Sequence, residues 1–149
     1  MNDFTIEHVL KSEYQTLVEV WEASVRATHH FLKEEDILYF RPLILNSYLD
    51  AVMLRCAKDN QGKILGFLGV SENNLEMLFI HPDKSGMGIG STLLDYAIEE
   101  LQVQKVDVNE QNEQALGFYL KKGFEVIGRS ALDGSGKPYP ILHMKLKNY

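Results

Sequence analysis

The sequence predicts an α/β fold of the α+β kind, in which a mixed central sheet of about seven strands carries four helices. Three features predict it. Short apolar runs have the length of strands, and longer stretches have apolar residues three and four apart, as in helices. A glycine-rich turn joins one of the predicted strands to one of the predicted helices. The chain has 149 residues, of which 45% are hydrophobic, so we expect one core and a single domain over residues 1–149.

The amino-terminal third predicts one strand and two helices. Apolar and polar residues alternate over 4–9, which is typical of an edge strand. The next segment predicts an amphipathic helix with Ser12 as its N-cap. A second helix is expected over about 34–52, kinked or restarted at Pro42, because proline has no amide hydrogen to donate. The apolar face of the first helix is made by Tyr14, Leu17, Val18, Trp21 and Val25.

The middle of the chain predicts three strands. Two apolar runs, 53–58 and 63–70, flank the turn 59–62, whose Asp, Asn and Gly tolerate unusual backbone angles, so we expect a β-hairpin. A third run, 75–81, ends at Pro82.

The last third predicts helices and strands in alternation. The helix after the glycine turn has one apolar face, and the helix over 112–122 is stopped by Gly123, a natural left-handed cap. Strands are expected over 105–108, 124–132 and 139–146. The apolar face of the first of these helices is made by Leu93, Leu94, Ala97, Ile98 and Leu101.

Composition narrows the class of protein. The formal net charge of −6 argues against nucleic-acid binding, which relies on a basic surface. No apolar run approaches the roughly 20 residues of a membrane-spanning helix. The amino terminus lacks a signal-peptide pattern, and the single cysteine, Cys56, cannot form an internal disulfide, so we expect a cytoplasmic protein. No Cys, His and Asp cluster has metal-ligand spacing, so we expect no metal.

The turn over 85–91 predicts a phosphate-binding site. Amides at a helix amino terminus are unpaired and point the same way, the helix dipole adds partial positive charge, and glycines let an anion approach the backbone. Two other phosphate motifs fit poorly. A nucleotide P-loop needs a lysine before the Ser or Thr, and here Gly90 is followed directly by Ser91. A dinucleotide fingerprint does not match the glycine spacing either.

Two segments at this point resemble a known family. Ile80-His81-Pro82-Asp83, followed by Gly86-Met87-Gly88-Ile89-Gly90 and a Leu-Leu helix, resembles motif A of the GNAT superfamily of N-acetyltransferases. Thirty residues on, the segment 109–124 has an asparagine, an alanine three later, a Phe-Tyr pair and then Gly-Phe, which resembles the second signature of that family. One position departs from the pattern: Ser85 stands where the family usually has Arg or Gln, and Lys84 is the nearest replacement charge.

The resemblance implies acetyl-CoA as co-substrate and assigns the residues that hold it. The backbone of one strand would pair with the pantetheine arm and polarise the thioester carbonyl, and the amides of the glycine turn would hold the pyrophosphate. Asn112 would hydrogen-bond the arm or serve as a plain helix N-cap, and one residue can do both, while Ala115 would leave room for the arm. Asn109 would orient a water or the thioester. The implied cofactor-binding residues are Leu78, Phe79, Ile80, Ser85, Gly86, Met87, Gly88, Ile89, Gly90, Ser91, Asn109 and Asn112.

The resemblance also implies the chemistry, an attack by a primary amine on the thioester in a ternary complex. Tyr119 resembles the general acid, because a phenol can protonate the leaving thiolate. Glu76, alone in an apolar strand, is the candidate general base, directly or through water. His29 and Tyr139 are candidate substrate-binding residues, although a capping histidine and a core tyrosine explain them as well.

The sequence leaves the acceptor open: a small molecule or a protein amine fits equally. A non-catalytic acyl-CoA-binding module of the same fold, a longer acyl donor and unrelated phosphate binding are the alternatives. A monomer or a homodimer is expected.

Overall fold

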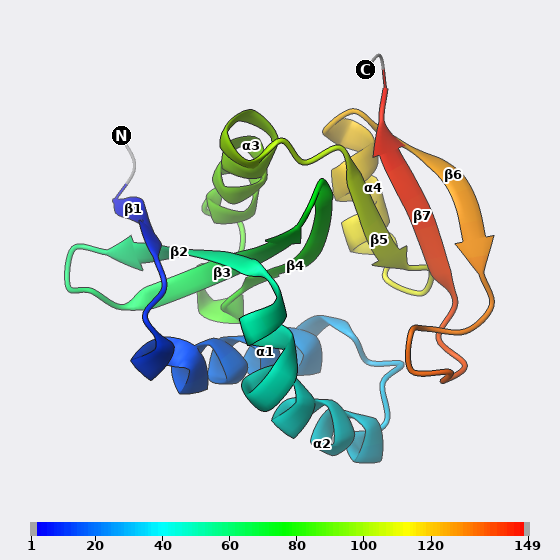
Figure 1. The fold of residues 1–149 in the computed structure, drawn as a ribbon, viewed down its shortest axis with the longest axis horizontal. Coiled ribbons are helices and arrows are strands. Elements are labelled where there is room, and N and C mark those ends of the chain that lie inside the picture. Colours follow the sequence, from blue (N-terminus) through cyan, green and yellow to red (C-terminus); the bar gives the residue numbers. More distant parts are fainter. Residues whose placement is uncertain (1–2, 148–149) are drawn as a thin grey trace.

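The computed structural model describes residues 3–147 and contains a seven-stranded mixed sheet with helices on both faces (Figure 1). The strand order is β1-β2-β3-β4-β5-β7-β6. All neighbouring strands are antiparallel except β4 and β5, which are parallel. The strands are β1 Phe4–His8, β2 Met53–Asp59, β3 Ile64–Ser71, β4 Asn74–Ile80, β5 Lys105–Asn109, β6 Phe124–Ser130 and β7 Ile141–Leu146.

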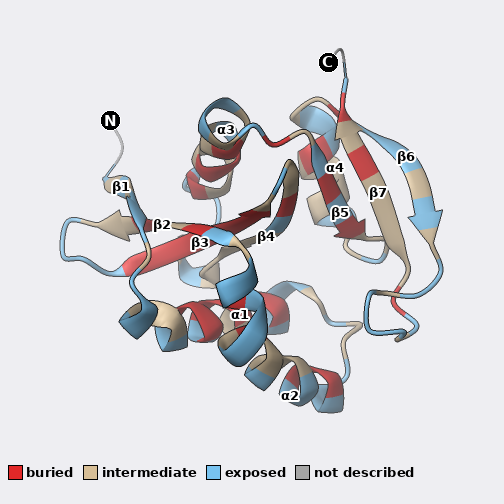
Figure 2. Cartoon of the chain, in the orientation of Figure 1, coloured by how far each residue is buried: buried red, intermediate tan, exposed pale blue. Residues whose placement is uncertain are grey.

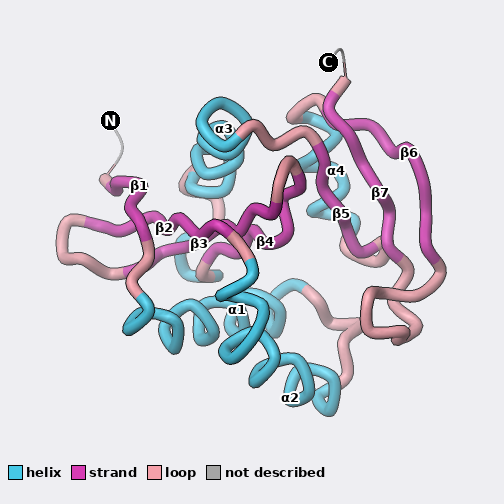
Figure 3. The backbone as a smooth tube through the Cα atoms, in the orientation of Figure 1, coloured by secondary structure: helices cyan, strands magenta, loops and turns pink. Residues whose placement is uncertain are grey.

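Helices α1 and α2 cover one face of the sheet, and α3 and α4 cover the other (Figure 3). The α-helices are α1 Tyr14–Thr28, α2 Glu34–Leu43, α3 Ile89–Leu101 and α4 Glu113–Lys121. Four short elements join them: η1 Lys11–Glu13, η3 Leu49–Ala51 and η4 Pro82–Lys84 are 3-10 turns, and η2 Ile44–Tyr48 is a π-helical turn. The order of strands and long helices is the one that the sequence predicts.

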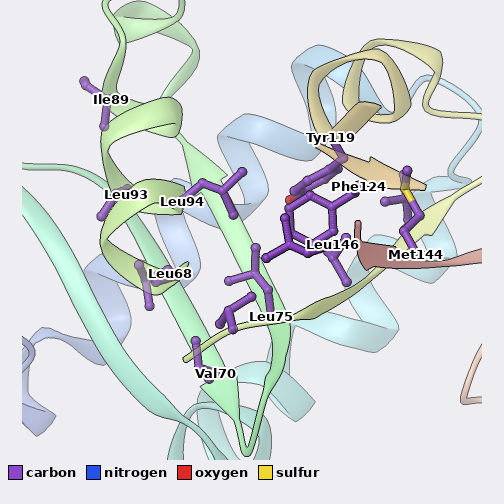
Figure 4. Packing of buried hydrophobic residues seen from close by; sticks show 14 of the residues in the cluster. Leu68, Val70, Leu75, Ile89, Leu93, Leu94, Tyr119, Phe124, Met144 and Leu146 are labelled. Carbon is purple, nitrogen blue, oxygen red and sulfur yellow. The ribbon is translucent and has the colours of Figure 1, made fainter. Parts of the chain in front are cut away.

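The hydrophobic core consists of one cluster on each face of the sheet, and the buried residues lie mainly on its central strands and the inner faces of the helices (Figure 2). On the α3 and α4 face, Leu94 of α3 points toward Phe124 of β6, and both side chains are completely buried (Figure 4). On the other face, Leu17 and Val18 of α1 are completely buried. Each cluster therefore fixes one pair of helices against the sheet.

Two predicted details of the elements are wrong, the N-cap of the first helix and the extent of the last two strands. Ser12 does not cap the first helix: it lies inside η1, and the Glu13 carboxylate accepts a hydrogen bond from the Leu10 amide at 2.9 Å. The second helical stretch agrees with the prediction, because α2, η2 and η3 follow one another from Glu34 to Ala51 and the winding changes just after Pro42. Pro42 lies inside α2 and removes one backbone donor, and the winding widens into η2 two residues later.

The second wrong detail concerns the last two strands, which are shorter than predicted. The sixth strand ends at Ser130 instead of residue 132, and the seventh begins at Ile141 instead of residue 139. Pro140 explains the later start, because a proline has no amide to give to the β-ladder.

The feature of the fold that matters most for function is the junction of β4 and β5. These two parallel strands pair only at their first residues, Asn74 with Lys105 and Leu75 with Val106, and then diverge (Figure 1). Beyond those two pairs the backbones of both strands face an opening in the sheet instead of each other.

Candidate active site

A cleft of about 630 Å³ occupies the opening between β4 and β5. Its walls are the two diverging strands, the loop before α3, the start of α4 and the end of α1. Almost all of the sequence-predicted site residues line it. They are Glu76, Leu78, Phe79, Ile80, Ser85, Gly86, Gly88, Ile89, Gly90, Ser91, Asn109, Asn112, Tyr119 and His29.

A β-bulge shapes the β4 wall of the cleft. Gly69 pairs with Met77 and Val70 pairs with Leu75, so Glu76 is one residue too many for the β3–β4 ladder. The extra residue of a bulge is left unpaired, and the strand bends there. Strict alternation along the strand would place the Glu76 side chain on the same face as Leu78, and the bulge breaks that alternation. Glu76 is exposed in the cleft.

The glycine turn is built as an anion cradle at the start of α3. Gly86 and Gly88 have φ angles of 83° and 80°, and an added Cβ would meet no atom within 4 Å at either position. Gly88 is the N-cap of α3, so the amides of the first helical turn point outward without intrahelical partners. The geometry of this loop fits a pyrophosphate.

Two cations flank the cradle. Lys84 lines the cleft directly before Ser85. Lys122, which no local pattern connects to the loop, donates a hydrogen bond to Ser91 Oγ at 2.8 Å and pairs with Asp95 at 2.7 Å. Met87 is exposed and is not part of the cleft lining.

Tyr119 of α4 projects its ring into the core and its hydroxyl into the cleft. Its ring packs against Phe124, with ring centroids 5.7 Å apart (Figure 4). Within residues 3–147 the hydroxyl has no hydrogen-bond partner, yet no buried side-chain oxygen or nitrogen in that range is unpaired. The hydroxyl is therefore open to the cleft, which Tyr119 lines. Burial raises the pKa of this phenol, so it stays protonated at neutral pH.

Asn112 caps α4 and also reaches across the cleft to α1. Its side-chain oxygen accepts a hydrogen bond from the Ala115 amide at 3.1 Å, so the N-cap reading of this residue is correct. Its amide nitrogen lies 3.3 Å from His29 Nε2. Asn109 holds the turn before α4, where its side chain accepts from the Gln111 amide at 2.9 Å.

His29 is held in one neutral form by its neighbours. Thr28 Oγ1 donates to the Ser24 carbonyl at 2.8 Å and therefore accepts from His29 Nδ1, 2.7 Å away. His29 Nε2 is then the acceptor for Asn112. Burial, with the nearby charge of His30, lowers the pKa of His29 to about 4. The ring is thus uncharged at neutral pH.

Tyr139 does not line the cleft. It belongs to a second, smaller pocket of about 360 Å³ between the α1–α2 loop and the β6–β7 loop. Its hydroxyl donates to the buried carboxylate of Asp36, which also pairs with Lys137 at 2.8 Å. Hydrogen bonds from Lys137 and Tyr139 lower the pKa of Asp36. This contact ties the amino end of α2 to the β6–β7 loop.

Comparison with known proteins shows what this architecture is. A family model described as an acetyltransferase (GNAT) domain matches residues 44–146, more than two thirds of the chain. The chain belongs to the GNAT acetyltransferases. As a member of that family it is an acetyl-CoA-dependent N-acetyltransferase.

Several GNAT proteins resemble it over nearly their full length. The peptidyl-lysine N-acetyltransferase YjaB of Escherichia coli K12 is 42% identical over 132 residues, which cover 89% of each chain. The solution structure of apo-form YjaB from Escherichia coli superposes with a TM-score of 0.88 and 37% identity, covering 98% of this chain and 99% of that one. PaiA N-acetyltransferase from Thermoplasma acidophilum, solved with coenzyme A, shares the fold at a TM-score of 0.70 and 24% identity, covering 99% and 100% of the two chains.

Two further observations concern ions and membranes. Among residues 3–147 no group of three or more His, Cys, Asp or Glu side chains is arranged to hold a metal ion. No helix in that range is long and apolar enough to cross a bilayer.

Sequence reasoning missed several residues of this GNAT site. Lys122 and Asp107 contribute charged groups, and Ser24, Thr28 and Phe118 complete the walls. Asp107 alternates with two buried valines of β5, and that alternation is the only local sign that it faces away from the α3 and α4 side.

Proposed function

We propose that the protein transfers the acetyl group of acetyl-CoA to the ε-amine of lysine residues in other proteins. The relatives named peptidyl-lysine N-acetyltransferase support the acceptor class, because one of them is 42% identical over 89% of both chains. The observation that carries the activity is the cleft between β4 and β5. The anion cradle at the start of α3 and the hydroxyl of Tyr119 both line this cleft.

The donor is held by backbone more than by side chains. The amides at the start of α3 bind the pyrophosphate, and Lys84 and Lys122 lie beside them. Ser85, in place of the family's usual Arg or Gln, therefore removes one contact to the donor and leaves the backbone cradle intact. The pantetheine arm lies along β4, whose residues Leu78 to Ile80 line the cleft where β5 has separated from it. The donor supplies an acetyl thioester, which is already activated for attack.

Direct transfer to the amine is favoured over an acyl-enzyme on cysteine. The single cysteine, Cys56, is completely buried, and burial raises its pKa to about 11. A buried thiol of that acidity does not provide a thiolate nucleophile at neutral pH.

Two residues act at the thioester. Tyr119 donates its proton to the departing thiolate, because its hydroxyl reaches the cleft and its raised pKa keeps it protonated. Glu76, exposed in the cleft at the bulge, takes the proton of the incoming ammonium group, directly or through water, and so leaves a neutral amine. The neutral ring of His29 and Asn112 form the wall on the α1 side.

The test measures thiol release from acetyl-CoA with lysine peptides whose α-amine is blocked. We expect Tyr119→Phe to lower kcat on the order of 10²-fold, because it removes a general acid while keeping the buried ring. The dissociation constant for acetyl-CoA should change by less than about twofold, since interactions made only in the transition state affect kcat. Tyr48→Phe, an exposed tyrosine outside the cleft lining, is the matched control.

Three outcomes distinguish the alternatives. Acetylation of the lysine side chain, located by mass spectrometry, supports the proposal. Binding of acetyl-CoA without transfer to any amine would instead identify a non-catalytic acyl-CoA-binding module. Transfer to free small amines but to no peptide would overturn the protein acceptor and keep the reaction.

A further inference from the structure

A string of three polar side chains runs across β5, β7 and β6, beside the cleft. Asp107 Oδ1 lies 2.7 Å from His143 Nδ1, and His143 Nε2 lies 2.7 Å from Ser130 Oγ. Asp107 and His143 are directly opposite each other in the β5–β7 ladder. Ser130 is 13 positions from His143 in the chain, and Asp107 is 36 positions from it, so the pairing of strands in the sheet brings the three together.

The chemistry of the string fixes the orientation of each group. A carboxylate can only accept, so His143 Nδ1 carries the proton and donates it to Asp107. In a neutral imidazole Nε2 is then an acceptor, and the Ser130 hydroxyl donates to it. His143 thus holds one oxygen of the Asp107 carboxylate, and Ser130 holds the His143 ring at its other nitrogen. The other carboxylate oxygen of Asp107 makes no hydrogen bond within residues 3–147.

Asp107 lies on the side of the cleft that faces away from the glycine turn. Its neighbours Val106 and Val108 are buried in the cluster with α3 and α4, so the Asp107 side chain lies on the opposite face of β5. Asp107 lines the cleft, as does His29 from α1 on that face. An amine that approaches the thioester from this face meets the free oxygen of Asp107.

Glu76, the other carboxylate in the cleft, lacks such support. Within residues 3–147 its side chain makes no hydrogen bond or ion pair, and it is exposed. A catalytic base is most effective when a third group holds it in position, which is the arrangement of Asp107 with His143.

We propose that Asp107 takes the proton from the acceptor amine, with His143 and Ser130 as positioning residues. The proposal rests on the proposed acetyl transfer. The amine enters in its neutral form; as its nitrogen bonds to the carbonyl carbon, one N–H bond breaks and the proton passes to the free oxygen of Asp107. The C–S bond breaks and Tyr119 protonates the sulfur. Asp107 then returns its proton, through solvent, to the Tyr119 phenolate, so protons balance over one turnover.

The test is chemical rescue of Asp107→Ala by formate. The substitution removes the carboxylate and leaves space for a small one. We expect kcat with the acceptor to fall on the order of 10²-fold, and sodium formate to restore it in a dose-dependent way. Sodium chloride at equal ionic strength should restore nothing. The dissociation constant of acetyl-CoA should stay within about twofold, because Asp107 lies away from the cradle.

Companion variants make the result specific. Asp107→Asn fills the space and should be equally slow but not rescued; it also serves if the alanine variant fails to fold. His143→Gln should lower kcat roughly tenfold with KM for the acceptor little changed, which is the pattern of a displaced proton acceptor. Glu125→Gln, on the neighbouring strand β6 and outside the cleft lining, should behave as wild type.

Several results would overturn the role of Asp107: wild-type kcat in Asp107→Ala, a loss that formate does not restore, or formate rescue of Glu76→Ala instead. Failure of the proposed function is a separate result. If the wild type acetylates a small amine but no lysine peptide, the protein acceptor is wrong, and the same rescue measured with that amine still decides the role of Asp107.

Discussion

His29 illustrates how single residues are tuned by the fold. Its ring accepts from Asn112 and donates to Thr28, and burial lowers its pKa to about 4 from a reference of about 6.5. A histidine whose folded pKa is depressed stabilises the protein fully above its unfolded pKa. That contribution is lost as the pH falls below about 6.5 towards 4, because the unfolded chain then binds the proton more readily.

We therefore expect His29 to make the protein acid-sensitive. Between pH 7 and pH 5 the wild type should lose about 2 kcal/mol of unfolding free energy that His29→Gln does not lose. Urea denaturation at both pH values measures the difference. His8→Gln, an exposed histidine on β1, is the control and should follow the wild type. An equal pH dependence in wild type and His29→Gln would show that the ring is not held neutral.

At the scale of elements, the position of β4 is decided by its contact with β3. Gly66 pairs with Ile80, and a Cβ added to Gly66 would lie 2.7 Å from Cδ1 of Ile80 and 2.9 Å from the Phe79 carbonyl oxygen. Those two β4 residues line the cleft. The missing side chain of Gly66 therefore lets β3 and β4 approach closely just where β4 faces the donor.

Two glycine substitutions should have opposite effects. Gly66→Ala should lower the unfolding free energy by about 1–3 kcal/mol and weaken acetyl-CoA binding, because the backbone at Phe79 must move. Gly117 lies in the middle of α4, and a Cβ added there would meet no atom within 4 Å. Gly117→Ala should therefore raise the free energy of unfolding by about 0.5–1 kcal/mol. Thermal and urea unfolding measure both; a neutral Gly66→Ala would mean that β4 is free to shift.

At the scale of the whole molecule, the cleft divides the sheet into two parts. β1 to β4 lie on one side and β5 to β7 on the other, and within residues 3–147 the ladder between them consists of two residue pairs of β4 and β5. The His29–Asn112 contact and the link of Asp36 to Tyr139 and Lys137 are side-chain connections across this division. A donor bound between β4 and β5 would contact both parts at once.

Acetyl-CoA should accordingly stabilise the protein as a whole. At a concentration of 100 times its dissociation constant, a ligand that binds only the folded state adds about 2.7 kcal/mol, which raises Tm by roughly 5–10 °C for a chain of this size. Differential scanning fluorimetry measures the shift. ATP and NAD at the same concentration should give a smaller shift, because they lack the pantetheine arm that lies along β4. A larger shift with ATP or NAD would contradict the assignment of the cleft to acetyl-CoA.

The sequence by itself determined the order of the elements and the two signatures of the acetyltransferase site. The spacing of apolar residues predicted the long helices and strands. The glycines before α3 and the asparagine before α4 predicted the turns that precede these helices. Each of these patterns depends on residues only a few positions apart in the chain. The helix cap at Ser12 was misplaced, since a 3-10 turn differs from the start of an α-helix by a small change in winding.

The tertiary structure alone decided where β4 and β5 separate, how the bulge at Glu76 is formed and which distant side chains meet. Lys122 reaches Ser91 across 31 positions, and Asp107 reaches His143 across 36. Such contacts depend on strand order and register, which no local pattern specifies. The sequence therefore predicted the glycine turn and most of the residues of β4 and α4 that line the cleft, whereas the polar contacts between distant residues required the folded sheet.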